Sequence, residues 1–169
     1  HPDDETLGCG GILAEVASRG YPVTVIIATN GEASHPASPT HSPDDLARIR
    51  RTEASDAMSV LAPGCRLVLL DLPDGRLDEA GPALRAAIAD AVGAGPAWLL
   101  TTWEQDRHPD HAACSRAARR VAADHPARTI AEYPIWAWHW GDPAGHDLPV
   151  AAMTRIPVSD AAAAARQRA

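Results

Sequence analysis

Short apolar runs that alternate with longer helical segments constrain the fold of this chain more than any other feature of its sequence. Runs of β-branched and leucine residues occupy residues 22–29, 66–72 and 97–102, and a fourth strand is expected at 128–133. Uninterrupted apolar runs of this length are typical of strands that are covered on both faces. Because such strands alternate with helices, the sequence predicts an α/β fold, a Rossmann-like three-layer sandwich with a mostly parallel sheet.

The segments between the strands carry the features of helices. Proline, serine and aspartate residues mark the expected helix starts, and glycine or proline residues follow the expected ends. Helices are predicted at residues 2–19, 43–61, 78–92 and 109–124. The last segments are predicted to be a strand or extended loop at 135–140, a strand at 150–158 and the first turns of a helix at 160–169.

Size, charge and cysteine content narrow the possible functions. The 169 residues suit one domain over residues 1–169, which we expect to be truncated at both ends because the chain begins inside a motif. A net charge of −7 argues against nonspecific nucleic-acid binding. No apolar run approaches the roughly 20 residues of a membrane span. Three cysteines without a CxxC spacing favour a reducing, cytoplasmic location.

Two loops carry near-copies of one polar cluster, His1-Pro2-Asp3-Asp4-Glu5 and His108-Pro109-Asp110-His111. By composition about 0.06 copies of His-Pro-Asp are expected, whereas two occur. Each copy opens a predicted helix in a loop where an α/β sheet places its ligands. A capped helix start with proline at its first position would explain one such stretch. It would not require a histidine in each copy, nor His111.

Three of these side chains have the composition of a hydrolytic metal site. His1 and Asp4 are three residues apart and therefore point the same way on a first helical turn. His111 would complete the set from the other loop, which leaves an open position for water. Two imidazoles and one carboxylate suit Zn²⁺, and Fe²⁺ also fits.

The neighbouring polar residues suggest the rest of the chemistry. Asp3 lies beside the expected ligands without being needed as one, so it can act as a general base. His108 and Asp110 form a histidine–carboxylate pair. A protonated His108 could stabilise a tetrahedral oxyanion or protonate a leaving amine.

The paired motifs resemble those of the PIG-L/LmbE family of zinc-dependent N-acetylglucosaminyl deacetylases. The stretches HPDDE at 1–5 and HPDH at 108–111 carry the resemblance. Three weaker matches are Thr29-Asn30-Gly31-Glu32, the Arg50–Glu53 pair and Leu72-Pro73-Asp74-Gly75. The resemblance covers most of the chain and implies removal of an acetyl group from an amino-sugar conjugate, a small-molecule substrate.

The resemblance implies the same zinc ligands, the same base and the same oxyanion-stabilising histidine with Asp110 as its orienting partner. It adds Arg50 as a contact to the sugar or its aglycone, for which a surface ion pair with Glu53 is the alternative. One position departs from the pattern of some members. Asp106 stands where these members have a tyrosine that assists the oxyanion, and an ionised aspartate cannot do this.

Aromatic residues near these motifs are further candidates for substrate binding. Trp103 lies on the loop before the second motif, where it either lines the pocket or closes the end of the sheet. Trp136, Trp138 and Trp140 are expected to share one side of an extended segment. Of these, Trp138 is our candidate for stacking on a sugar, with core packing as the alternative.

The sequence therefore predicts a zinc-dependent deacetylase that acts on an amino sugar. Two alternatives stay open: a zinc amidohydrolase for a non-sugar or antibiotic amide, and a non-catalytic carbohydrate-binding module on the same fold. A nucleotide-binding Rossmann domain is disfavoured, because no GxGxxG follows a predicted strand.

Overall fold

The computed structural model describes residues 1–142, 144 and 147–169 of the chain. Its helices are α1 (Asp4–Ser18), α2 (Pro43–Leu61), α3 (Gly81–Val92), α4 (Pro109–Ala123), α5 (Ala137–Trp140) and α6 (Asp160–Arg168). Its strands are β1 (Thr24–Ile27), β2 (Arg66–Leu69), β3 (Ala97–Thr102) and β4 (Arg128–Tyr133), and a 3-10 helix spans Val150–Ala152. The predicted alternation of strands and helices is confirmed along the chain from α1 to β4.

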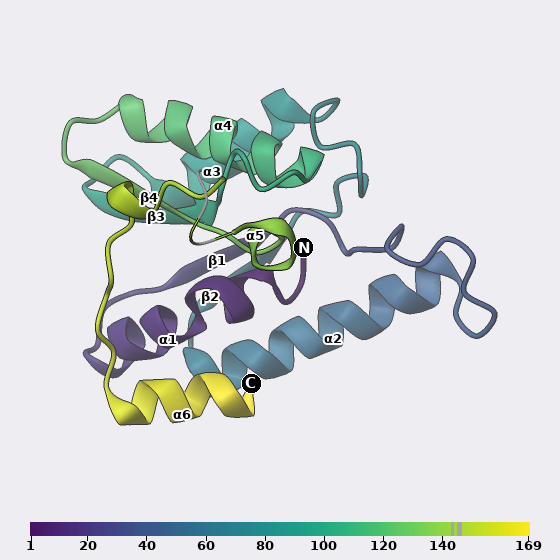
Figure 1. Cartoon of the computed structure of the whole chain (residues 1–169), viewed down its shortest axis with the longest axis horizontal. Helices are drawn as coiled ribbons and strands as arrows, with labels where there is room; N and C mark the ends of the chain where they lie inside the picture. Colours follow the sequence, from purple (N-terminus) through teal and green to yellow (C-terminus); the bar gives the residue numbers. More distant parts are fainter. Residues whose placement is uncertain (143, 145–146) are drawn as a thin grey trace.

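The strands form two parallel pairs. β1 runs beside β2, with Thr24 opposite Arg66, and β3 runs beside β4, with Ala97 opposite Arg128. The predicted α/β class and the parallel strands are thus confirmed. The hydrogen bonds of the described residues define two two-stranded sheets rather than one continuous sheet (Figure 1).

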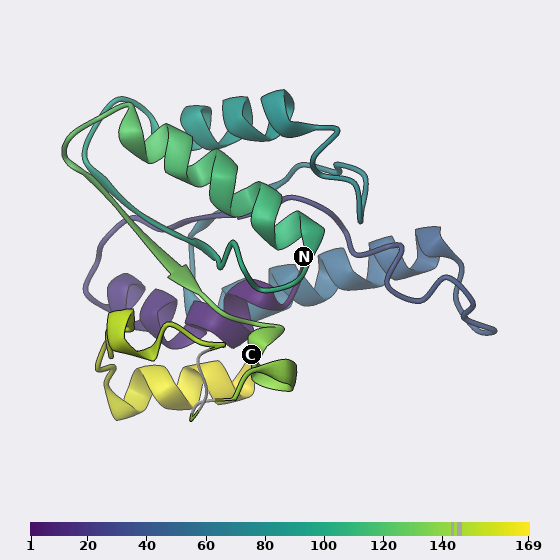
Figure 2. The same cartoon turned by 45° about the horizontal axis from the view of Figure 1, so that its top comes forward.

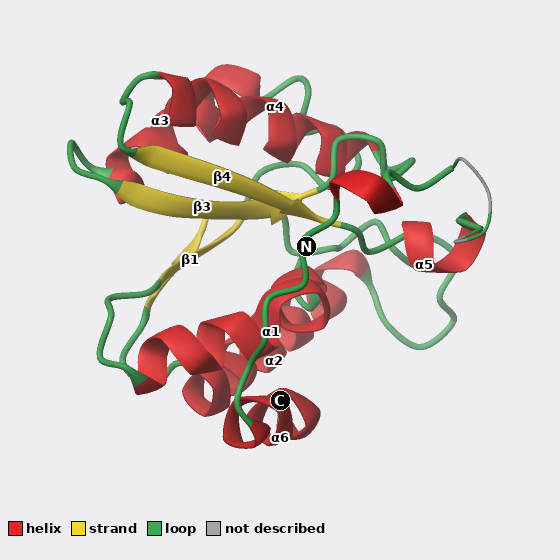
Figure 3. Cartoon of the chain, turned by 60° about the vertical axis from the view of Figure 1, so that its left-hand side comes forward, coloured by secondary structure: helices red, strands yellow, loops and turns green. Residues whose placement is uncertain are grey.

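Helices cover the strands on two sides. In Figure 3, α3 and α4 lie above β3 and β4, whereas α1, α2 and α6 lie on the opposite side of the strands. Each side has its own apolar core. The first is centred on Leu84, Leu99 and Val121, and the second on Ile27 and Leu61.

The last helix packs beside the first, as Figures 1 and 2 both show. Ala162 and Ala165 of α6 are buried in the second core. Arg166 donates to the backbone carbonyls of Thr6 and Leu7, and Ser159 donates to Glu15. α6 therefore holds the helix that carries the first motif.

Two predictions for the last third of the chain are wrong. Residues 135–140 turn into the short helix α5, because the carboxylate of Asp106 binds three successive backbone N–H groups there. Residues 150–158 form a 3-10 turn followed by unpaired chain. Pro149 precedes this segment and Pro157 lies within it, and proline cannot donate a hydrogen bond to a strand ladder.

None of the helices in the described part of the chain combines the length and apolar composition that crossing a membrane requires.

Candidate active site

The loops that follow all four strands meet around His1. The loop after β1 reaches the loop after β2, where Thr29 Oγ1 donates to Asp74 Oδ1 over 3.1 Å. The loop after β2 reaches α4, where Gly75 N–H donates to Asp110 Oδ2 over 2.7 Å. The loop after β3 reaches the residues after β4 through Asp106. The site therefore forms at the carboxyl ends of the strands, where α/β folds bind their ligands.

His1, Asp4 and His111 form a compact cluster at this point. One oxygen of Asp4, Oδ2, lies 2.9 Å from His1 Nδ1 and 3.1 Å from His111 Nε2. The candidate ligand atoms of the three residues all lie within 4.8 Å of one another. The structure thus brings together two imidazoles and a carboxylate from sequence positions more than a hundred residues apart.

The outer nitrogen of each imidazole is bound by a carboxylate. His1 Nε2 lies 3.2 Å from Asp74 Oδ1 and 3.3 Å from Asp110 Oδ2. His111 Nδ1 lies 2.6 Å from Asp106 Oδ2. A histidine that binds a metal usually donates its other N–H to such a carboxylate, which fixes the tautomer and orients the ring.

The inner nitrogen of His111 provides a test of whether a metal fits. This buried Nε2 atom has no hydrogen-bond partner among the described residues. Because Nδ1 donates to Asp106, Nε2 presents a lone pair towards the cluster. An unsatisfied buried polar atom costs about 1–3 kcal/mol. The donor set and this free lone pair therefore fit a divalent metal ion.

The cluster has a strongly anionic environment. Burial lowers the pKa of His1, but hydrogen bonds to Asp110, Asp4 and Asp74 outweigh it and raise this pKa to about 12. Burial raises the pKa of Asp4, but its interactions with His1 and His111 lower this pKa to about 2. The carboxylates therefore favour a positive charge at the position of His1.

Asp3 lies next to the cluster in a different environment. Its side chain is 61% exposed, and its Oδ2 accepts a hydrogen bond of 2.9 Å from Arg50. Its backbone has a φ of 89°, in the left-handed region that aspartate and asparagine tolerate better than most residues. Loss of water around the carboxylate raises the pKa of Asp3 and outweighs the lowering effect of Arg50. Asp3 is thus an accessible carboxylate beside the cluster.

His108 borders the cluster from the start of α4. Its ring is stacked against that of His111, with 4.6 Å between centroids, and lies 4.7 Å from that of His1. His108 Nδ1 accepts the backbone N–H of Asp110 over 3.2 Å. The neutral ring consequently carries its proton on Nε2 and acts there as a donor. Burial lowers the pKa of His108, as do the charges of His1 and His111.

The carboxylate of Asp110 connects the loop after β2 to His1. This carboxylate is 1% exposed and accepts hydrogen bonds from the backbone N–H groups of Gly75 and Leu77, besides its contact with His1. These interactions, led by that with His1, lower its pKa against the effect of burial. Among the described residues it is the backbone of Asp110, rather than its carboxylate, that hydrogen-bonds to the ring of His108.

The weaker sequence motifs build the surroundings of His1. Glu32 accepts the backbone N–H of Asp74 over 3.1 Å, and Asp74 in turn accepts the backbone N–H of Ala33 over 2.9 Å. Burial raises the pKa of Asp74, but its interactions with His1, Ala33 and Thr29 lower it to about 2. The two loops therefore hold the carboxylate that orients His1.

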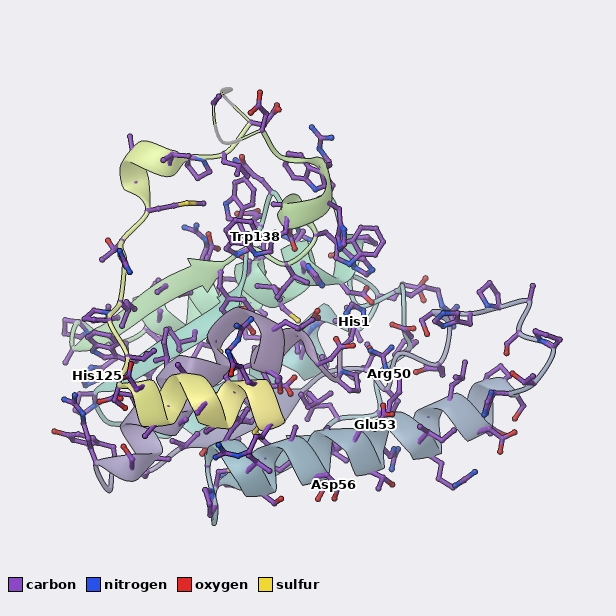
Figure 4. All side chains as sticks on the ribbon, turned by 60° about the horizontal axis from the view of Figure 1, so that its bottom comes forward. His1, Arg50, Glu53, Asp56, His125 and Trp138 are labelled. Atoms are coloured by element: carbon purple, nitrogen blue, oxygen red, sulfur yellow. The ribbon has the colours of Figure 1, made fainter. Side chains whose placement is uncertain are left out.

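Arg50 passes over the first of these loops to reach the first motif. It donates to the backbone carbonyl of Pro2 over 2.6 Å as well as to Asp3, and Figure 4 shows it on α2 beside His1. A Cβ atom at Gly31 would lie 2.1 Å from the Arg50 guanidinium. Only glycine therefore allows Arg50 this path. Its ion pair is formed with Asp3 rather than with Glu53.

The tryptophans do not share one side, contrary to the prediction. Trp103 and Trp140 stack with 6.3 Å between ring centroids, and Arg107 covers the ring of Trp140. Trp136 instead packs edge-on against His108. Trp138 is 67% exposed. The helical turn of α5 separates these side chains, which an extended segment would have aligned.

Asp106 is a site residue whose role the sequence analysis missed, as it missed the contact of Asp74 with His1. The carboxylate of Asp106 is fully buried and binds His111 as well as the turn before α5. Its position five residues before His111 gave a signal, because a carboxylate in that loop can reach the outer nitrogen of a histidine in the following helix turn.

Comparisons with known proteins identify the family of the chain and several relatives. The model of the PIG-L family, described as GlcNAc-PI de-N-acetylase, matches residues 1–122. A 1D-myo-inositol 2-acetamido-2-deoxy-alpha-D-glucopyranoside deacetylase from Tsukamurella paurometabola is 29% identical over 137 residues, which are 78% of this chain and 40% of that protein.

Two solved structures illustrate the fold. A deacetylase triple mutant of teicoplanin biosynthesis has a TM-score of 0.70 at 22% identity and covers 99% of this chain and 76% of its own. A 4-carboxy-2-hydroxymuconate hydratase from Pseudomonas putida has a TM-score of 0.59 at 21% identity and covers 73% of this chain and 52% of its own. At these identities the likeness concerns the fold alone, and this fold carries more than one reaction.

The chain spans less than half the length of the Tsukamurella relative. The family match nevertheless covers both His-Pro-Asp motifs and every residue of the His1, Asp4 and His111 cluster. This confirms the resemblance seen in the sequence, and the chain belongs to the PIG-L family.

Proposed function

We propose that this chain is the catalytic part of a metal-dependent deacetylase that removes an N-acetyl group from an amino sugar, such as an N-acetylglucosamine conjugate. The observation that carries the proposal is the cluster of the partly buried His1 with the buried Asp4 and His111, with Asp3 and His108 on its border. The names of the family and of the inositol-linked relative support the substrate class.

The metal in this proposal is Zn²⁺, with Fe²⁺ as the alternative for the same donors. His1, Asp4 and His111 would hold it, and Asp106, Asp74 and Asp110 would orient the two imidazoles. When bound, such an ion polarises the amide carbonyl and makes water a better nucleophile near neutral pH.

Asp3 and His108 provide the proton acceptor and the hydrogen-bond donor of the proposed reaction. Asp3 accepts a proton from water as the water oxygen bonds to the carbonyl carbon. His108 donates from Nε2 to the carbonyl oxygen as negative charge develops there. The carbon–nitrogen bond then breaks as the nitrogen takes up the proton that Asp3 accepted from water, and acetate and the free amino sugar are released. Asp110 keeps the ring of His108 in place through its backbone N–H.

The substrate contacts in this proposal are Arg50, Trp103 and Trp138. Arg50 stands beside the base, and Trp138 offers an exposed ring on α5. We also infer one Rossmann-like three-layer sandwich, since the two strand pairs lie between two groups of helices (Figure 3). The three cysteines, all free in the structure, support a cytoplasmic location.

A paired measurement of metal content and amine release tests the proposal. The full-length protein is purified, bound zinc and iron are quantified, and amine release from N-acetylglucosamine conjugates is followed with and without a chelator. Asp3→Asn is the matched variant, because it removes the base without removing a ligand. We expect one equivalent of metal in both proteins and chelator-sensitive release in the unaltered protein alone.

The other outcomes contradict specific parts of the proposal. Release from a non-sugar N-acetyl amide but not from the sugar conjugates would favour the amidohydrolase alternative. Metal without release from any amide would overturn the deacetylase assignment, and hydration of an unsaturated acid would then point to the chemistry of the hydratase neighbour. A folded protein that binds no metal would overturn the ligand set and favour a binding module.

A further inference from the structure

We propose that Trp136 is a specificity-determining residue that contacts the sugar ring of the substrate, and that Asp106 is the positioning residue that holds it beside His108. This inference rests on the proposed function, because it concerns the substrate of the same site. Among the tryptophans at 136–140 it assigns the sugar contact to Trp136, and it gives Asp106 a role that the sequence motifs do not indicate.

The surroundings of Trp136 indicate a role outside the core. Its ring packs edge-on against that of His108, with 5.0 Å between centroids and 65° between ring planes. Its side chain is nevertheless 47% exposed. Tryptophan is highly buried on average, so an open indole that touches a catalytic candidate is a surface for a ligand.

One carboxylate holds Trp136 in this position. Asp106 accepts the backbone N–H groups of Ile135, Trp136 and Ala137 over 3.1, 2.9 and 2.7 Å. The same carboxylate accepts from His111 Nδ1 over 2.6 Å. Because it is fully buried, Asp106 has no water to exchange for these donors. It therefore couples the metal ligand His111 to the turn that carries Trp136.

The contacts of His108 indicate which part of the substrate Trp136 meets. The ring of His108 lies 4.6 Å from that of the candidate ligand His111 and 5.0 Å from the half-exposed ring of Trp136. An amide whose oxygen reaches His108 therefore lies close to Trp136, and its solvent-facing part is the part that can contact the indole. The acetyl side ends one carbon beyond the carbonyl, so the larger, solvent-facing part is the amino sugar. The C–H face of a pyranose packs well on an aromatic face.

Substitutions at Trp136 test this contact, with Trp98→Ala as the matched control. Trp98 is 73% exposed at the start of β3, the strand end away from the site. KM and kcat are measured on the full-length protein with an N-acetylglucosamine conjugate and with a small N-acetyl amine that has no sugar ring. Binding of the sugar conjugate to the zinc-loaded protein is measured separately by calorimetry.

We expect Trp136→Ala to raise KM for the sugar conjugate roughly tenfold with little change in kcat. Trp136→Phe should restore most of this loss, and the KM of the small amide should not change. A KM that rises equally for both amides, or that rises no more than in Trp98→Ala, would overturn the proposal. Weaker binding in Trp136→Ala together with no turnover in the unaltered protein would support the contact and contradict the proposed reaction instead.

Asp106→Asn tests whether Asp106 couples His111 to Trp136. If it does, one substitution changes both the zinc affinity and the KM for the sugar conjugate. The amide keeps the size of the side chain but loses an acceptor. We expect a roughly 10- to 100-fold weaker zinc affinity together with the raised KM for the sugar conjugate. Trp136→Ala should leave zinc affinity unchanged. If Asp106→Asn changes neither zinc affinity nor KM, Asp106 is not the positioning residue.

Discussion

The two His-Pro-Asp triplets have the same residues but stand in different registers relative to their helices. In the first, α1 begins at Asp4, so that His1 lies before the helix and Asp3 caps it with a φ of 89° and without a side-chain hydrogen bond. In the second, His108 caps α4 and accepts the backbone N–H of Asp110. Each triplet is followed directly by a candidate ligand, Asp4 or His111, but only the first triplet also contributes its own histidine to the His1, Asp4 and His111 cluster.

The aspartates of the two triplets, Asp3 and Asp110, differ in exposure and in their partners. Asp3 is exposed and paired with Arg50, whereas Asp110 is buried and holds Gly75, Leu77 and His1. Backbone register and burial therefore decide which carboxylate can exchange protons with a substrate and which one supports the site. An identical motif does not imply an identical role.

The largest expected effect follows from Asp3→Asn. The substitution removes the proposed base, so kcat should fall by roughly 10²- to 10⁴-fold. Asparagine tolerates the left-handed backbone of this position, and the lost ion pair with Arg50 is exposed, so stability should change by less than about 1 kcal/mol. Steady-state kinetics and thermal unfolding check both parts. Retained activity would show that Asp3 is not the base.

Asp110→Asn should lower the stability of the protein more than Asp3→Asn does. Asparagine keeps one acceptor oxygen, so one of the N–H groups of Gly75 and Leu77 loses its partner in a buried position. We expect the free energy of unfolding to fall by about 2 kcal/mol, as measured by urea denaturation. A loss of stability no larger than that of Asp3→Asn would remove the distinction between the two aspartates.

The smallest expected effect concerns the anchoring of α1. Glu15 accepts from the backbone N–H and hydroxyl of Ser159 over 2.9 and 2.6 Å, and with Arg19 these bonds lower its pKa to about 2. A lowered pKa in the folded state contributes stability above the unfolded pKa of about 4.3. This contribution is lost as the pH falls towards 2.

Glu15→Gln should consequently lower the thermal midpoint slightly at pH 7, and the difference from the unaltered protein should shrink between pH 4.5 and 3, roughly the range below the unfolded pKa. Thermal unfolding of both proteins at a series of pH values measures this. A difference that stays constant with pH would show that the carboxylate charge does not anchor α1 to α6.

Local sequence signals predicted much of the fold. The apolar runs located the strands, and the proline and serine starts located the helices, because these signals act within a few residues. The α5 turn could not be predicted in this way. It depends on Asp106, which lies thirty residues earlier and whose hydrogen bonds override the alternation of tryptophans at 136–140.

In the candidate site, too, local signals were predicted from the sequence and long-range contacts were not. The spacing of His1 and Asp4 and the repetition of the motif predicted the cluster that the structure brings together. The carboxylates that orient the imidazoles come from the loop after β2, the loop after β3 and the first turn of α4, and their contacts with the two imidazoles depend on how these segments pack together. Asp74 was noted only as part of a turn, and the contact of Asp110 with His1 requires the packing of α4 against the loop after β2.

The most direct test of this account compares metal binding by two adjacent, isosteric variants, Asp3→Asn and Asp4→Asn. Metal content per protein and zinc affinity are measured for both, with circular dichroism to establish that each is folded. We predict one equivalent of zinc in Asp3→Asn and a large loss of zinc affinity in Asp4→Asn, because only Asp4 lies between the two imidazoles. Zinc retained by Asp4→Asn, or lost by Asp3→Asn, would contradict the assignment of roles within the first motif.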